Sequence, residues 1–232
     1  MACTPSRLAD CLGGDILFQA SRVMGAVTIL QAGDLGPIAT PAEDGRAVVG
    51  VAWHSQAMLT IAAARRLLPL QQAVIMTLPH RRGRVLARYA ARLHVATVTL
   101  GDRPLERLRS VAQVLQLTRQ GYMAFLAADG PAGPAFRAKA AIVALAQSAG
   151  AVLVPCALAC SRALALPRWD RSLVPLPGAR IVLTTSTPID PARQADRASV
   201  EDIRAALERA LFEVNCAARR LIGSLPQGLE AP

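Results

Sequence analysis

The feature that most constrains the fold is a regular alternation of short apolar runs with longer segments of helical composition, beginning near residue 47. We expect strands at 47–53, 73–78, 95–99, 122–127, 151–158 and 180–184, and helices at 55–68, 83–93, 103–119, 137–148 and from Ser199 onward. Strands that alternate with helices favour a mostly parallel sheet whose two faces are both covered by helices. The pattern therefore predicts an α/β fold.

The first 45 residues stand apart from this alternation. Apolar residues recur at near-helical spacing, which predicts one or two amphipathic helices over 6–31, while glycines and prolines indicate a loop over 33–45. We expect residues 1–45 to form an N-terminal helical segment and loop, and 46–232 to form the α/β domain, in a single globular domain overall. The helical segment either packs on the sheet or dips into a membrane. Its apolar stretch is short and interrupted by polar residues, so no transmembrane helix is expected.

Charge is concentrated in one quarter of the chain. The 26 Lys and Arg exceed the 16 Asp and Glu by 10, and residues 65–119 alone hold eleven Arg against two acids, a balance of +9. Such a stretch predicts either solvated helix faces or a basic surface for lipid headgroups, phosphates, an acidic carrier protein or nucleic acid. Tyr89 is its single aromatic residue, so base stacking, and with it nucleic-acid binding, is disfavoured. The five cysteines lack zinc or redox spacing and predict reduced thiols.

Reactive side chains in such a sheet gather where strands end. His54 follows the first strand, where it serves either as a general base or as a structural or capping residue. His80 follows the second strand beside Arg81, Arg82 and Arg84, which favours an anion-binding cluster.

The fourth strand runs into a loop with two glycines and two prolines, from Asp129 to Pro134. A loop of this composition is rigid, and it either presents Asp129 at a site or forms a tight connection between strand and helix.

The order of these segments resembles the lysophospholipid acyltransferase-like superfamily, and within it a bacterial branch known only as a domain of unknown function. The resemblance extends from about residue 45 to 190 and is most specific over 129–189. The matching strings are Ala52-Trp53-His54, His80 to Arg88, Leu100-Gly101-Asp102, Asp129-Gly130-Pro131-Ala132-Gly133-Pro134, Ala144 to Ala151, Val154-Pro155, Arg168-Trp169-Asp170-Arg171 and Thr187-Pro188-Ile189.

This resemblance implies a glycerolipid acyltransferase-like fold and an enzyme of lipid metabolism. The enzyme would move a fatty acyl group from acyl-CoA or acyl-carrier protein to a hydroxyl or amine of a lipid-like acceptor. It implies no metal or redox cofactor, and a peripheral position at an anionic membrane surface, the inner face of the cytoplasmic membrane. A silent lipid- or carrier-binding member, or a thioesterase on the same scaffold, is the alternative.

The resemblance also implies roles for individual residues. In the wider superfamily a His in an H-x-x-x-x-D motif deprotonates the acceptor, and the Asp orients that His. Here His54 is the implied base, but Leu59 stands at the Asp position, so Asp129 is expected to support His54. The implied substrate-binding residues are His80, Arg81, Arg82, Arg84, Gly101, Gly130, Pro131, Gly133 and Pro155.

Overall fold

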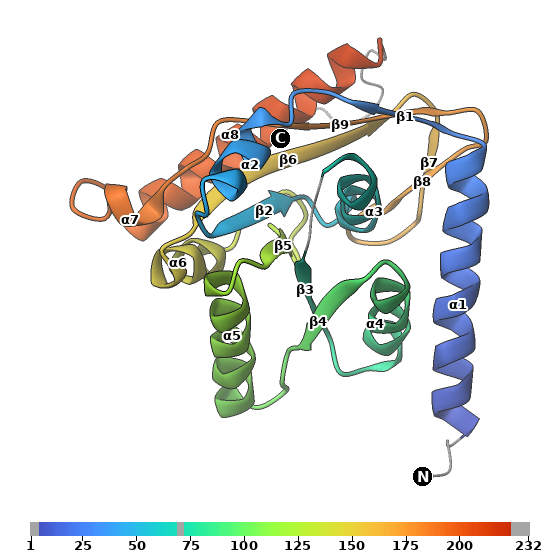
Figure 1. Ribbon diagram of the computed structural model, residues 1–232, viewed down its shortest axis with the longest axis horizontal. Helices are drawn as coiled ribbons and strands as arrows, with labels where there is room; N and C mark the ends of the chain where they lie inside the picture. Colours follow the sequence, from blue (N-terminus) through green and yellow to red (C-terminus); the bar gives the residue numbers. More distant parts are fainter. Residues whose placement is uncertain (1–4, 69–71, 224–232) are drawn as a thin grey trace.

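The protein is built on one seven-stranded sheet, seen in a computed structural model that describes residues 5–68 and 72–223 (Figure 1). The spatial order of its strands is β1-β9-β6-β2-β5-β3-β4. Their bounds are Ile29–Ala32 (β1), Val48–Ala52 (β2), Ala73–Thr77 (β3), Val95–Thr99 (β4), Met123–Ala127 (β5), Val152–Cys160 (β6) and Arg180–Thr185 (β9). The five strands from β6 to β4 are parallel, β9 is antiparallel to β6, and β1 is parallel to β9. The predicted mostly parallel α/β sheet is confirmed.

Helices cover both faces of this sheet because the side chains of each central strand alternate between two cores. Val49 and Val51 of β2 pack with the helices α5 (Pro104–Arg119), α6 (Ala140–Ala149) and α8 (Val200–Leu221). Val48 and Ala52 pack with α2 (Gly36–Glu43), α3 (Ala57–Leu67) and α4 (Arg81–Arg92).

Four further elements lie outside the sheet and the helices that cover it. The long helix α1 (Pro5–Ala26) packs against α4 and forms an outer layer at one side of the molecule (Figure 1). A hairpin of β7 (Ala163–Ala165) and β8 (Leu173–Pro175) connects β6 to β9. The short helix α7 (Pro191–Gln194) precedes α8.

The segment before residue 46 differs from its prediction in two places. Residues 36–43, expected in a loop, form α2, because Pro37 occupies the first turn, where a missing N–H costs nothing, and Ile38 is fully buried. The predicted helical segment 6–31 ends at Ala26, and Ile29 begins β1, which pairs with β9. β1 is a mostly exposed edge strand of four residues, too short to show a strand pattern.

Candidate active site at the carboxyl edge of the sheet

His54 lies just beyond the carboxyl end of β2, where the chain leaves the core. The preceding Trp53 is 1% exposed and packs edge-on against Phe136, with ring centroids 5.5 Å apart. This buried ring fixes the backbone at the strand end, and His54 follows with its side chain 31% exposed. The predicted general base is therefore at an edge that a substrate can reach.

The imidazole of His54 is held by Asp170. Its Nδ1 lies 2.7 Å from Oδ2 of Asp170, whose side chain is fully buried. The hydroxyl of Ser172 donates to the same oxygen at 2.6 Å, and Nε of Arg168 lies 3.5 Å from the other. Burial opposes ionisation of the Asp170 carboxyl, but the hydrogen bonds from Ser172 and His54 and the charge of Arg168 outweigh it and lower its pKa.

An ionised Asp170 fixes the tautomer of His54. A carboxylate only accepts hydrogen bonds, so Nδ1 carries the proton and Nε2 is left with its lone pair. Nε2 has no hydrogen-bond partner in the part of the chain that the structure describes. The arrangement is that of a base that a carboxylate orients through one ring nitrogen, while the described residues leave its second nitrogen without a partner.

The sheet topology explains how Asp170 reaches His54. β6 runs parallel to β2 and ends at the carboxyl edge, and β9 starts at that same edge because it runs the opposite way. The connection between them, residues 161–179, therefore stays over the edge where His54 lies. Leu173 donates its backbone N–H to the carbonyl of Ser55 at 2.9 Å, which fastens the β7–β8 hairpin beside the base.

Asp129 is also beside His54, but it does not hold the ring. It is 1% exposed, and its carboxylate accepts the backbone N–H of His54 at 2.8 Å and that of Phe136 at 2.9 Å. Asp129 was expected to support His54, and it does contact this residue, but at its backbone N–H, whereas Asp170 contacts the ring nitrogen.

Two glycines of the 129–134 loop let it approach the site closely. A Cβ on Gly130 would lie 2.9 Å from Cδ2 of His54, and a Cβ on Gly133, which also has φ +72°, would lie 2.9 Å from the ring of Trp169. Trp169 in turn lies beside the base, with its ring centroid 5.1 Å from that of His54. The absence of a side chain at Gly130 and Gly133 therefore lets the loop lie directly against His54 and Trp169.

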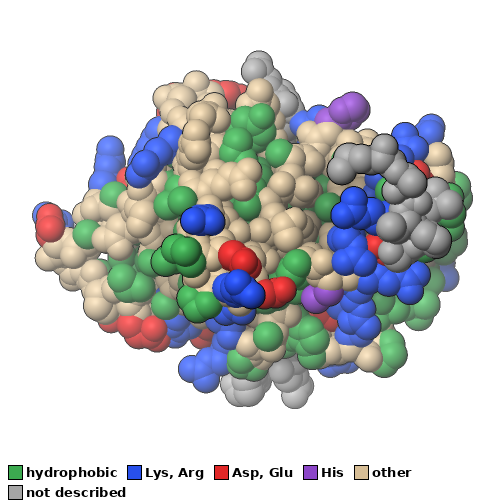
Figure 2. Space-filling model, turned by 90° about the horizontal axis from the view of Figure 1, so that it is seen from below, with side chains coloured by type: hydrophobic (Ala, Val, Ile, Leu, Met, Phe, Trp, Pro, Cys, Tyr) green, Lys and Arg blue, Asp and Glu red, His purple; other side chains and the backbone are tan. Residues whose placement is uncertain are grey.

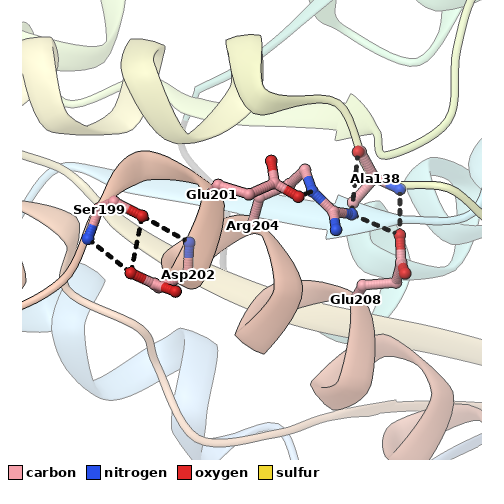
Figure 3. Close-up of polar contacts among 6 residues, drawn as sticks. All are labelled: Ala138, Ser199, Glu201, Asp202, Arg204 and Glu208. Atoms are coloured by element: carbon pink, nitrogen blue, oxygen red, sulfur yellow. Dashed lines mark hydrogen bonds and ion pairs between the residues drawn. The ribbon is translucent and has the colours of Figure 1, made fainter.

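Helix α8 holds the segment that follows this loop, at Ala138 (Figure 3). Glu208 accepts the backbone N–H of Ala138 at 2.9 Å and a guanidinium N–H of Arg204 at 2.7 Å. At the start of α8, Ser199 and Asp202 form a capping box that satisfies the first backbone donors of the helix (Figure 3). The loop is therefore tied to a well-capped helix at one end and to His54, through Asp129, at the other.

The predicted anion-binding cluster is largely engaged elsewhere. Its residues lie at the start of α4, after β3, two strands away from β2 in the sheet. Arg84 donates to Asp10 of α1 at 2.7 Å, and Arg81 lies 3.4 Å from the same carboxylate. His80 is the exposed N-cap residue of α4 without a capping side-chain bond, and Arg82 is exposed.

The remaining predicted binding residues have different places. Gly101 packs tightly against α5, since a Cβ there would lie 2.2 Å from that of Glu106. Pro155 is buried within β6 opposite Val51, and only Pro131 of the predicted prolines lies exposed in the site loop. Gly101 and Pro155 therefore support the fold rather than line the site.

Asp170, Ser172 and Trp169 were not predicted as site residues. The string from Arg168 to Arg171 is visible in the sequence, but Asp170 lies 116 residues after His54, in a short hairpin with no apolar periodicity. The signal that was available is an unusual string, Trp-Asp between two arginines, in a segment without a predicted element.

Other features bear on what the chain can bind. A cleft of about 470 Å³ opens at the opposite, amino edge of the sheet, between Arg46, Gln72 and Tyr122, away from His54. Within residues 5–68 and 72–223, no three His, Cys, Asp or Glu side chains gather as a metal site would require. The described helices include none whose length and apolar content would carry it across a bilayer.

Comparison with known proteins gives a distant match. No known family model matches the chain. A protein of Rickettsia prowazekii (strain Madrid E), itself uncharacterized, is 23% identical over 111 residues, which are 48% of this chain and 50% of that protein. The chain thus spans about half the length of the curated relative that it matches, and the name of that relative states no activity.

Proposed function

We propose that the protein is an acyltransferase that moves a fatty acyl group from a thioester donor, acyl-CoA or acyl-carrier protein, to a hydroxyl or amine of a lipid-like acceptor. His54 is the general base and Asp170 its orienting carboxylate. The glycerolipid acyltransferase-like fold is part of this proposal. It is supported by the mostly parallel sheet and by the order of the motif strings along the chain.

One observation carries the proposal: the 2.7 Å contact between Nδ1 of His54 and the buried carboxylate of Asp170, at the carboxyl edge of a parallel sheet. A solvent-exposed structural histidine needs no buried carboxylate behind its ring. A buried carboxylate in turn is costly unless its partners compensate for the lost hydration. A ring nitrogen that no described residue engages is what proton abstraction from an acceptor requires.

The reaction that fits this geometry has two steps. Nε2 of His54 takes the proton of the acceptor hydroxyl as its oxygen attacks the thioester carbonyl carbon, and Asp170 stabilises the imidazolium that forms. The tetrahedral intermediate then collapses, the carbon–sulfur bond breaks, and the proton on Nε2 passes to the departing thiolate. The products are the acylated acceptor and a free thiol, so protons and electrons balance without a further reactant.

The test is acyl transfer by the purified full chain, with long-chain acyl-CoA and acyl-carrier protein as donors and hydroxyl- and amine-bearing lysolipids as acceptors. Acylated acceptor and released thiol are measured separately. We expect His54→Ala to lower transfer about 10²–10⁴-fold, the usual contribution of a general base. His94→Asn is the control. His94 is exposed just after the carboxyl end of α4, and its φ of +56° suits Asn.

Acylated acceptor, released thiol and binding of acyl-CoA together separate the alternatives. Thiol release without an acylated product would replace transfer by thioester hydrolysis. Binding of acyl-CoA with no thiol release from any donor would indicate a silent binding protein. Full activity in His54→Ala would remove His54 from the mechanism.

A further inference from the structure

Helix α1 is unusual for a surface helix: its two acidic side chains pair with α4, while several of its large apolar side chains are exposed and Leu17, Phe18 and Met24 are half-buried. Asp10 is 4% exposed and pairs with Arg84 and Arg81 of α4. Asp15 pairs with Arg88 at 3.0 Å and with Arg92 at 2.7 Å. An ordinary surface helix buries its apolar face and exposes its charges. Here the arginines of α4 hold both acids of α1 on the inner side, and a second apolar face is left exposed.

The inner face of α1 is held closely against α4. Gly14 is buried, and a Cβ there would lie 2.5 Å from Cβ of Arg88, so the two helices approach at a residue without a side chain. Arg88 and Arg92 lower the pKa of Asp15 to about 2, so this carboxylate stays ionised at neutral pH. The orientation of α1 is therefore fixed by both shape and charge.

The outer face of α1 is an apolar stripe. Leu12, Ile16 and Val23 are 55%, 68% and 66% exposed, and their spacing places them on one side of the helix. Val27, the residue directly after the helix, is 43% exposed and extends this row. No described element covers this side, because α1 is the outermost helix there (Figure 1). A row of large exposed apolar side chains on one helix marks an interaction surface.

Charge indicates what covers the stripe. The two-helix layer of α1 and α4 holds seven arginines and two acids, 7 − 2 = +5, and both acids are already paired with arginines. Arg22 of α1 is exposed, and so are Arg7, Arg81 and Arg82 near the start of α1, where Lys and Arg side chains gather in Figure 2. An apolar stripe flanked by cations fits a lipid surface with anionic headgroups.

We infer that α1 is a docking surface for an anionic lipid bilayer, lying in the interface with the stripe Leu12, Ile16, Val23 and Val27 in the headgroup region. This extends the proposed function, which expects a lipid-like acceptor, by naming the part of the chain that meets the lipid. A second copy of the chain fits the stripe less well, because pairing two such layers would bring +5 against +5 with no exposed acid of α1 to compensate.

The experiment measures co-sedimentation of the full chain with phosphatidylcholine vesicles, with and without phosphatidylglycerol, in the absence of any acyl donor. We expect binding to the anionic vesicles that weakens as salt is raised. The double variant Ile16→Asn, Val23→Asn is expected to bind about tenfold or more weakly, since two apolar side chains no longer enter the interface.

The matched control is Leu105→Asn, Leu108→Asn on α5, where the two side chains are 61% and 67% exposed on the opposite face of the sheet. It carries the same change in apolarity and is expected to bind as the unmodified chain does. Equal thermal unfolding of both double variants verifies that the substitutions act at the surface. Equal vesicle binding by both would overturn the proposal.

Two further outcomes would also overturn the docking surface: no binding of the unmodified chain to anionic vesicles, or a dimer in solution that Ile16→Asn, Val23→Asn dissociates. Failure here is distinct from failure of the proposed function. If the chain binds vesicles but transfers no acyl group, the docking surface is supported and the acyltransferase proposal is overturned. If the chain acylates a detergent-dispersed acceptor but does not bind vesicles, the acyltransferase proposal is supported and the docking surface is overturned.

Discussion

The His54 site and the α1–α4 layer both pair carboxylates with cationic or ionisable partners, but they do so differently. At the site one fully buried carboxylate, Asp170, holds one ring nitrogen and leaves the other free. In the layer two carboxylates satisfy four arginines, whose side chains remain 40–74% exposed. The first arrangement leaves one imidazole nitrogen without a partner among the described residues, and the second holds two helices together. The richest run of charge in the sequence thus supplies the ion pairs between α1 and α4, whereas the candidate catalytic pair consists of two residues distant in sequence.

Asp170→Asn tests whether the buried carboxylate of the site acts on the His54 ring, and it has the largest expected effect. The amide cannot stabilise the imidazolium and offers its N–H₂ as readily as its oxygen, so the tautomer of His54 is no longer fixed. We expect transfer to fall about 10²–10⁴-fold, as it does when the carboxylate of a catalytic triad is replaced by its amide. The pH profile of the residual rate is the second readout, because the loss of a purely structural Asp170 would leave it unmoved. An unchanged rate and profile would reduce Asp170 to a structural role.

Gly130→Ala tests the same site through shape. The added Cβ would lie 2.9 Å from Cδ2 of His54, so the ring has to move away from its position over Asp170. Because small misplacements of a reacting group are costly, we expect a loss of about 10–10²-fold in kcat with little change in KM. Gly36→Ala, in α2, is the control, since its nearest neighbour would be Oδ1 of Asp34 at 3.3 Å. Equal rates in the two variants would contradict a tightly packed base.

Asp129→Asn separates backbone support from ring support. The buried carboxylate accepts two backbone N–H groups, and the amide keeps only one good acceptor, which leaves a buried donor unsatisfied. We expect a loss of about 2 kcal/mol in the free energy of unfolding in urea. The rate of the protein that remains folded should fall far less than in Asp170→Asn. The reverse order would restore the sequence-based expectation that Asp129 serves the imidazole.

Acid should release the α1–α4 layer before it disturbs the core. Asp15 titrates near 3.8 when α1 is undocked and near 2 when it is docked. A lowered pKa in the docked state means that its stabilising contribution is complete above pH 4 and is lost as pH falls toward 2. Hydrogen exchange of α1 amides should therefore accelerate over that interval relative to α8. In Asp15→Asn this acceleration should shrink, and an identical pH response in both proteins would dissociate Asp15 from the docking of α1.

The sequence predicted the sheet well because each central strand is buried on both faces and reads as a continuous apolar run. It missed β1, β7 and β8, which have three or four residues each and are partly exposed, so neither periodicity nor apolarity marks them. His54 was predicted because a strand end fixes its place. Its partner was not, because pairing Asp170 with His54 depends on β9 reversing direction beside β6, and no local pattern records strand direction.

Because β9 reverses direction beside β6, one part of the site lies in a connection separate from the sheet. Both ends of the 161–179 connection leave the sheet from one edge, so its length and composition can change without shifting β6 or β9. The base belongs to the scaffold, while its orienting carboxylate and the neighbouring Trp169 belong to an exchangeable segment. Grafting a different hairpin that keeps an aspartate at the position of Asp170 would preserve the reactive pair and alter the wall beside it. Under the proposed function, exchanging this one connection would alter the substrate range while His54 keeps its place at the end of β2.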